Sequence, residues 1–182
     1  MFYINYLVLD DEKERLSSIK DFRDFENDMD TVVGQIQLSF TNNSIGFVDI
    51  DIPYDGEFIV TWLRLLNEAI IYIEKYNFAT IYEPDTNNLW LEFYSYNERI
   101  KVTRTRVEHQ KIVPSHIEKS PQNHIETLWN DNVSKRVFYD VILKVTSEFI
   151  NEIKSLNPIV VNSRNLRKLI ASHNKAVELV MY

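Results

Sequence analysis

The sequence EFIVTWLRLLNEAIIYIEKY, residues 57–76, shows the helical periodicity on which the fold depends. Its apolar side chains recur every three or four positions, which predicts an amphipathic helix from Glu57 to Tyr76. A second apolar stripe leaves only a narrow polar face, so this helix is expected to be covered on two sides and to lie at the centre of the core. The side chains expected to be largely buried are those of Trp62, Leu66 and Ile70.

A β-hairpin is predicted directly before this helix. Residues 32–40 and 46–52 alternate apolar and polar side chains, and the residues between them favour a turn. Both apolar faces stay together only if Leu38 pairs with Val48 and Ile36 with Ile50.

That register places Asp49 and Asp51 on the outer face of the hairpin. Two carboxylates on one strand face can bind a metal or act as acid and base. A nuclease-like site would also need a further carboxylate and a lysine at short spacing on a neighbouring strand, and Glu92 is followed by Phe93 and Tyr94. We therefore interpret this face as an exposed acidic surface that a protein partner could bind.

A second hairpin is predicted from residues 89–96 and 99–107, closed by Asn97-Glu98. Its expected register places an aromatic and cationic set on one face: Trp90, Tyr94, Tyr96, Arg99 and Lys101. This composition is typical of binding hot spots and of platforms for single-stranded nucleic acid, although a covering helix would make the same pairs purely structural. Arg104 and Arg106 fall on the inner face, where they are expected to reach the sheet edge or to pair with acids.

The remaining elements complete an α+β fold, an antiparallel sheet built from hairpins and packed against a central helix and C-terminal helices. Residues 2–9 and 78–82 are predicted strands, and residues 12–25 a helix. Residues 134–156 form a predicted helix, and Ser163 is a good N-cap for a last one. No repeat or long linker divides the chain, so residues 1–182 are expected to form one domain.

Composition excludes several classes of protein. The chain is 45% hydrophobic and 26% charged, as is typical of a globular domain. Three glycines are too few for Gly-rich phosphate loops or nucleophile elbows, and the lack of Cys excludes disulfides and thiolate chemistry. With no basic leader and no apolar run of roughly 18 residues, we expect a cytoplasmic protein that does not enter a membrane.

The charge is distributed unevenly along the chain, whose net charge is −7. Residues 10–57 carry 13 acidic and 4 basic side chains, whereas residues 134–182 carry 4 acidic and 8 basic ones. Such asymmetry either packs against itself or presents two surfaces of opposite sign.

The four histidines do not predict a metal site. His109, His116 and His124 lack the short spacing and the companion carboxylates that ligand sets on regular elements show, so they are interpreted as loop residues. His173 lies on the apolar face of the last helix, where a hydrogen-bonded core histidine is expected. The sequence therefore predicts no metal, no cofactor and no catalytic residue.

The hairpin and the central helix resemble small acidic immunity proteins encoded beside bacterial polymorphic toxins. The likeness covers residues 32–73, where a hairpin with a glycine in each strand, Gly34 and Gly46, precedes a helix that contains Trp62-Leu63. It implies a bacterial, cytoplasmic protein without enzymatic activity that binds and blocks a toxin domain. The matching positions are structural, so the resemblance assigns no functional residue.

Three functions remain open from the sequence. The first is a protein-binding module, an immunity protein being the leading case, which uses the acidic face, the aromatic and cationic hairpin face, or both. The second is a regulatory protein that binds nucleic acid through the basic hairpin and the last helix. The third is an enzyme built on the acidic or histidine residues. The toxin class and the oligomeric state do not follow from the sequence.

Overall fold

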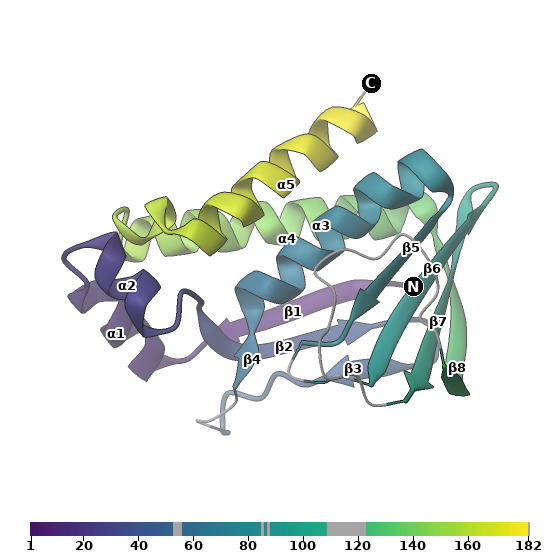
Figure 1. Ribbon diagram of the computed structural model, residues 1–182, viewed down its shortest axis with the longest axis horizontal. Helices are drawn as coiled ribbons and strands as arrows, with labels where there is room; N and C mark the ends of the chain where they lie inside the picture. Colours follow the sequence, from purple (N-terminus) through teal and green to yellow (C-terminus); the bar gives the residue numbers. More distant parts are fainter. Residues whose placement is uncertain (53–55, 85, 87, 109–122, 182) are drawn as a thin grey trace.

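The computed structural model describes residues 1–52, 56–84, 86, 88–108 and 123–181 (Figure 1). Two antiparallel sheets are covered by helices, which confirms the predicted α+β class. The first half of the chain contains β1 (Tyr3–Val8), α1 (Asp10–Ser18), α2 (Phe22–Asp28), β2 (Val33–Ser39), β3 (Ser44–Gly46), β4 (Glu57–Phe58) and α3 (Ile59–Tyr76). The second half contains β5 (Phe78–Tyr82), β6 (Leu89–Tyr96), β7 (Arg99–Val107), β8 (His124–Ser134), α4 (Lys135–Leu156), the 3₁₀ helix η1 (Val160–Asn162) and α5 (Arg164–Met181).

The first sheet has the order β1-β2-β3, and β4 also pairs with β2. The prediction of a strand over residues 46–52 is wrong, because β3 ends at Gly46 and pairs Leu38 with Ile45 instead of Val48. The turn is tighter than expected, since the Phe40 amide already donates to the Asn43 carbonyl at 2.8 Å.

Gly46 explains where the strand stops. Its φ of +68° is a left-handed conformation, and a Cβ there would lie 2.1 Å from the Ile36 carbonyl oxygen. Beyond it, the buried side chain of Gln35 replaces strand pairing, because its amide binds the Asp49 amide and the Ile52 carbonyl. Residues 47–52 therefore form a loop that stands away from β2.

The second sheet has the order β5-β6-β7-β8. The predicted hairpin register is confirmed, with Tyr96 opposite Arg99 and Trp90 opposite Thr105. The two hairpins were expected in one sheet and lie in two, because β2 is flanked by β1 and by β3 and β4, whereas β6 and β7 are flanked by β5 and β8.

Asp131 links the two sheets. This buried carboxylate on β8 accepts hydrogen bonds from the Asn42 amide at 2.7 Å and the Asn43 side chain at 3.2 Å, both in the β2–β3 turn. Burial opposes its ionisation, but these bonds and the Asn132 amide outweigh that effect and hold the pKa of Asp131 below its ordinary value.

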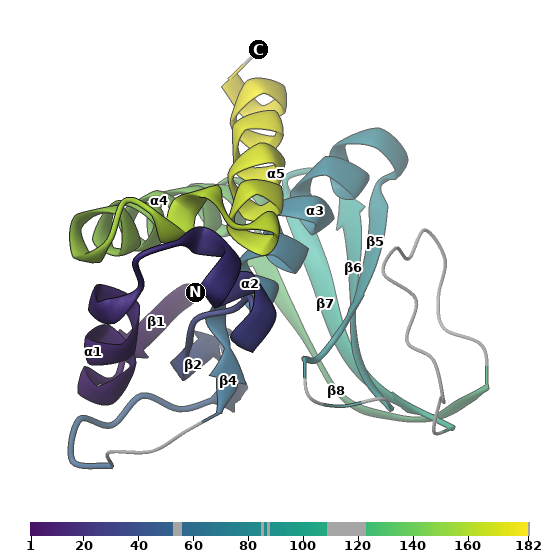
Figure 2. The same ribbon diagram turned by 60° about the vertical axis from the view of Figure 1, so that its left-hand side comes forward.

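The helices α3, α4 and α5 form two layers over the sheets, and α1 and α2 lie at one end of the molecule (Figures 1 and 2). α3 and α4 pack on the strands, and α5 packs on α3 and α4. Trp62, Leu66 and Ile70 on α3 are buried as predicted. α4 covers β1, where the Tyr6 hydroxyl donates to Glu152 at 2.8 Å. No helix in the described part of the chain is both long and apolar enough to span a bilayer.

The N-terminus of α5 is capped by acids from another segment. Ser163 stands at the expected position, but its hydroxyl has no hydrogen-bond partner among the described residues. Instead Glu26 accepts from the Arg164 amide at 2.6 Å, and Asp30 accepts from the Asn165 amide at 3.3 Å and from the Arg164 guanidinium at 3.0 Å. Part of the charge asymmetry is therefore self-complementary packing.

Candidate functional site

The exposed end of the β6–β7 hairpin carries four of the predicted partner-binding residues. Tyr94 and Tyr96 are 59% and 43% exposed, and Arg99 and Lys101 stand opposite them on β7, also exposed. The Tyr96 hydroxyl donates to Asn132 on β8 at 2.7 Å, and the Tyr94 ring meets Phe78 on β5 with ring centroids 5.5 Å apart. The aromatic rings are thus fixed on a four-stranded sheet. We call these four residues the hairpin face.

Trp90 does not belong to this surface, which corrects the prediction. Its side chain is 1% exposed although it points to the same side of the sheet, and its ring meets Tyr82 edge-on with centroids 6.0 Å apart. Thr105, the cross-strand neighbour of Trp90, is buried as well. On this side of β6, the side chains near the turn are exposed and Trp90, farther from the turn, is buried. The alternation of residues along β6 therefore predicted which side chains share a face, but not how many of them are exposed.

Aromatic residues on α3 form a further, partly exposed group that was not singled out from the sequence. Tyr72 and Tyr76 stack with centroids 5.9 Å apart, and the Lys75 ammonium lies 4.8 Å from the centre of the Tyr76 ring. Tyr76 is exposed and precedes Phe78 by two residues. The signal was present in the sequence, because residues four apart on a helix lie on the same face.

Asp49 and Asp51 are exposed but are not near the hairpin face. They lie in the loop of residues 47–52, which Figure 1 places beside β4, at the opposite end of the molecule from the β6–β7 turn. The Asp49 carboxylate accepts a hydrogen bond from the Asp51 amide at 2.9 Å, so it stabilises the conformation of the loop. The two predicted surfaces are therefore separate.

The arginines on the inner face of β7 pair with acids, as expected. Arg104 makes a two-bonded contact with buried Glu83, with nitrogen–oxygen distances of 2.5 and 2.7 Å, and Arg106 pairs with Glu126 on β8. These cations are neutralised within the fold, which weakens the case for a nucleic-acid surface on this strand.

A buried polar network joins three helices. The Asn67 side chain on α3 donates to the Leu63 carbonyl at 2.7 Å and to Thr146 on α4 at 2.8 Å. Its oxygen lies 3.3 Å from Nδ1 of His173 on α5, so His173 is hydrogen-bonded at the edge of the core, as predicted. Burial lowers the pKa of His173 below its ordinary value of 6.5.

This lowered pKa makes stability depend on pH. The unfolded chain takes up a proton on His173 at a higher pH than the folded protein does. The contribution of neutral His173 is therefore complete above pH 6.5 and is lost as the pH falls from 6.5 toward the folded pKa. Urea unfolding at pH 7.5 and pH 5.5, compared between the wild type and His173→Gln, measures it. We expect the wild type to lose more stability than the variant, and equal losses would contradict the assignment.

Residues of α5 line two of the surface hollows in the described part of the chain. One, of about 460 Å³, lies between α3 and α5, and the other, of about 350 Å³, lies at the starts of α4 and the β6–β7 turn. Glu74 lines the second hollow, where burial opposes its ionisation, but bonds from Lys135 and Tyr139 prevail and lower its pKa.

The histidine prediction is tested only in part. His109 and His116 lie outside the described residues, and His124 lies at the start of β8, 3.3 Å from the Thr127 hydroxyl. Across residues 1–52, 56–84, 86, 88–108 and 123–181, no three His, Asp or Glu side chains are grouped so that they could hold a metal ion.

No protein family, curated protein or solved structure gives a significant match to this chain.

Proposed function

We propose that this chain is a protein-binding module without catalytic activity, and that its partner docks on the hairpin face. The observation that carries the proposal is the pair Tyr94 and Tyr96, two large aromatic side chains that stay exposed on a rigid sheet. Fixed tyrosines make contact area at a low entropic cost, and Arg99 and Lys101 add charge and orientation. The resemblance of residues 32–73 to immunity proteins suggests a toxin domain as the partner, met in the bacterial cytoplasm.

Truncation of these tyrosines is expected to weaken binding much more than stability. Tyr94→Ala and Tyr96→Ala should each reduce affinity by about 2 kcal/mol, or roughly 30-fold, if they are hot spots. The assay is titration calorimetry with a toxin-like domain encoded beside this chain. Tyr3, a tyrosine on β1 that is 39% exposed, provides the matched control, since Tyr3→Ala removes the same group from the other sheet. Equal affinities of folded Tyr94→Ala, Tyr96→Ala and wild type would reject the hairpin face.

A second candidate is binding of single-stranded nucleic acid. The stack of Tyr72 and Tyr76, with Lys75 beside it, gives the end of α3 an aromatic and cationic surface on which bases could stack. Fluorescence anisotropy with a labelled oligonucleotide at increasing salt separates the two functions. Tight binding that falls steeply with salt and depends on Tyr76 would favour nucleic acid over a protein partner.

A further inference from the structure

The loop of residues 47–52 presents an apolar tip between two acids. Ile50 is 81% exposed, and its neighbours Asp49 and Asp51 are exposed too. A side chain this exposed contributes little to the core of its own molecule. The tip is therefore available for an intermolecular contact.

The tip is held in one conformation from within the fold. Gln35 is fully buried, and its Nε2 donates to the Ile52 carbonyl at 2.7 Å while its Oε1 accepts from the Asp49 amide at 2.8 Å. Inside the loop, the Ile52 amide donates to the Asp49 carbonyl at 3.2 Å. These bonds fix both ends of the tip, which reduces the entropy lost when Ile50 is buried against a partner.

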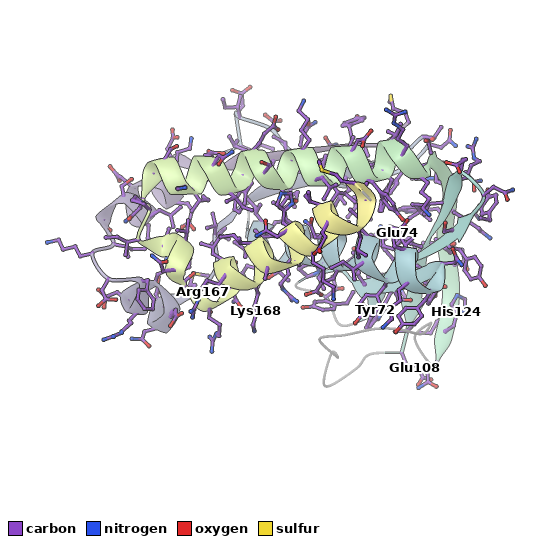
Figure 3. The ribbon with its side chains drawn as sticks, turned by 90° about the horizontal axis from the view of Figure 1, so that it is seen from above. Tyr72, Glu74, Glu108, His124, Arg167 and Lys168 are labelled. Atoms are coloured by element: carbon purple, nitrogen blue, oxygen red, sulfur yellow. The ribbon has the colours of Figure 1, made fainter. Side chains whose placement is uncertain are left out.

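A hollow of complementary chemistry lies between α3 and α5. Its apolar lining includes Ile71 and Ala171, and two exposed lysines, Lys168 and Lys175, also line it. Figure 3 shows Lys168 on α5 and Tyr72 on α3 along the same side of this helix pair. In the described part of the chain, no carboxylate lies within ion-pair distance of either lysine. Glu68, the acid that lines the hollow, is paired with Arg64 at 2.8 Å. We call this hollow the α3–α5 groove.

We propose that the α3–α5 groove receives the Asp49-Ile50-Asp51 tip of a second copy of this chain. Ile50 enters the apolar lining, and the flanking aspartates pair with Lys168 and Lys175. These lysines are two helical turns apart, about 10 Å along the axis, so they can stand on either side of one inserted apolar side chain. Charge complementarity between two surfaces of the same chain identifies a second copy as the occupant.

The two surfaces lie on different parts of the molecule, so the contact is heterologous. Figures 1 and 2 place the loop beside β4, under the sheets, and α5 on the far side of the helices. Each copy then offers one tip and one groove, and copies assemble head to tail. The assembly is a closed ring if the rotation from one copy to the next closes, and an open filament if it does not. The hairpin face takes no part in this contact.

Sedimentation velocity over a wide range of concentration tests the proposal. The average mass of the wild type is expected to rise above the 21.7 kDa of one chain and to fall when salt is added. Asp49→Lys/Asp51→Lys, Lys168→Glu/Lys175→Glu and Ile50→Ser should each weaken association by about 10-fold or more. Lys154→Glu, an exposed lysine on α4, is the matched charge control and should assemble like the wild type.

Mixing the two charge-reversed proteins is the decisive experiment. Alone, each variant brings like charges together, whereas a mixture pairs the reversed tip of one with the reversed groove of the other. We expect association to return in the mixture. A wild type that stays at 21.7 kDa at every concentration, or a mixture that stays monomeric, would overturn the proposal. These outcomes test self-association separately from partner binding at the hairpin face. Tyr94→Ala, which changes the hairpin face alone, should assemble like the wild type.

Discussion

Trp62→Ala is expected to lower the free energy of unfolding by about 3–5 kcal/mol, the range for large-to-small changes in a packed core. The Trp62 ring on α3 is almost completely buried, and its Nε1 donates to Glu57 at 2.6 Å across the junction of β4 and α3. Alanine would leave a cavity in the core beside α3, and it would also remove the hydrogen bond to Glu57.

Chemical denaturation of the purified variant measures this loss. Trp62→Phe is the useful comparison, because it keeps most of the ring volume but not the indole N–H, and it should lose less stability than the alanine variant. A loss below about 1 kcal/mol for Trp62→Ala, a value typical of surface changes, would show that α3 is not the centre of the core.

Glu83→Ala is expected to lower the free energy of unfolding by about 3 kcal/mol, because it leaves the Arg104 guanidinium of the second sheet without its ion-pair partner. The Glu83 side chain is 5% exposed and that of Arg104 is 23% exposed, so water reaches the arginine in part and the cost falls at the lower end of the range for buried pairs. Replacing both residues with apolar side chains should cost less than replacing Glu83 alone, since no charge is then left unpaired.

The ion pair of Arg106 and Glu126 provides the control for this prediction. Arg106 follows Arg104 by two residues on the same face of β7, but the side chains of its pair are 44% and 46% exposed. Glu126→Ala should therefore cost under about 1 kcal/mol. Denaturation curves for both variants test the difference, and similar losses would mean that burial does not set the strength of these pairs.

Elements whose cause is local were predictable from the sequence. The helix of residues 57–76 follows from its period and ends where Asn77 takes a left-handed conformation with φ of 57°. The β6–β7 register follows from a two-residue turn, and once the turn is placed every cross-strand pair is fixed. For that reason Tyr94, Tyr96, Arg99 and Lys101 lie on one face of the hairpin, as the predicted register required.

Features set by distant residues were missed. Residues 46–52 alternate like a strand, but Gly46 and the Gln35 side chain divert them into a loop. The strand β8 was not predicted, because its Asn130, Asp131 and Asn132 have low strand propensity, and the buried Asp131 carboxylate depends on hydrogen bonds from a turn some 90 residues away. The burial of Trp90 was missed likewise, because alternation along a strand predicts the face on which a residue lies but not whether that part of the face is exposed to solvent.

The position of β1 has a consequence for synthesis on the ribosome. This strand and β2 emerge early, yet the helix that covers β1 is α4, whose Glu152 binds the Tyr6 hydroxyl across 146 residues of chain. Until α4 has left the exit tunnel, β1 lacks the helix that covers it in the folded protein. Nascent chains with an exposed strand edge and an apolar face are substrates for chaperones and for aggregation. A translational pause after β2 and before α4 has emerged would therefore lengthen the period of greatest risk for this protein.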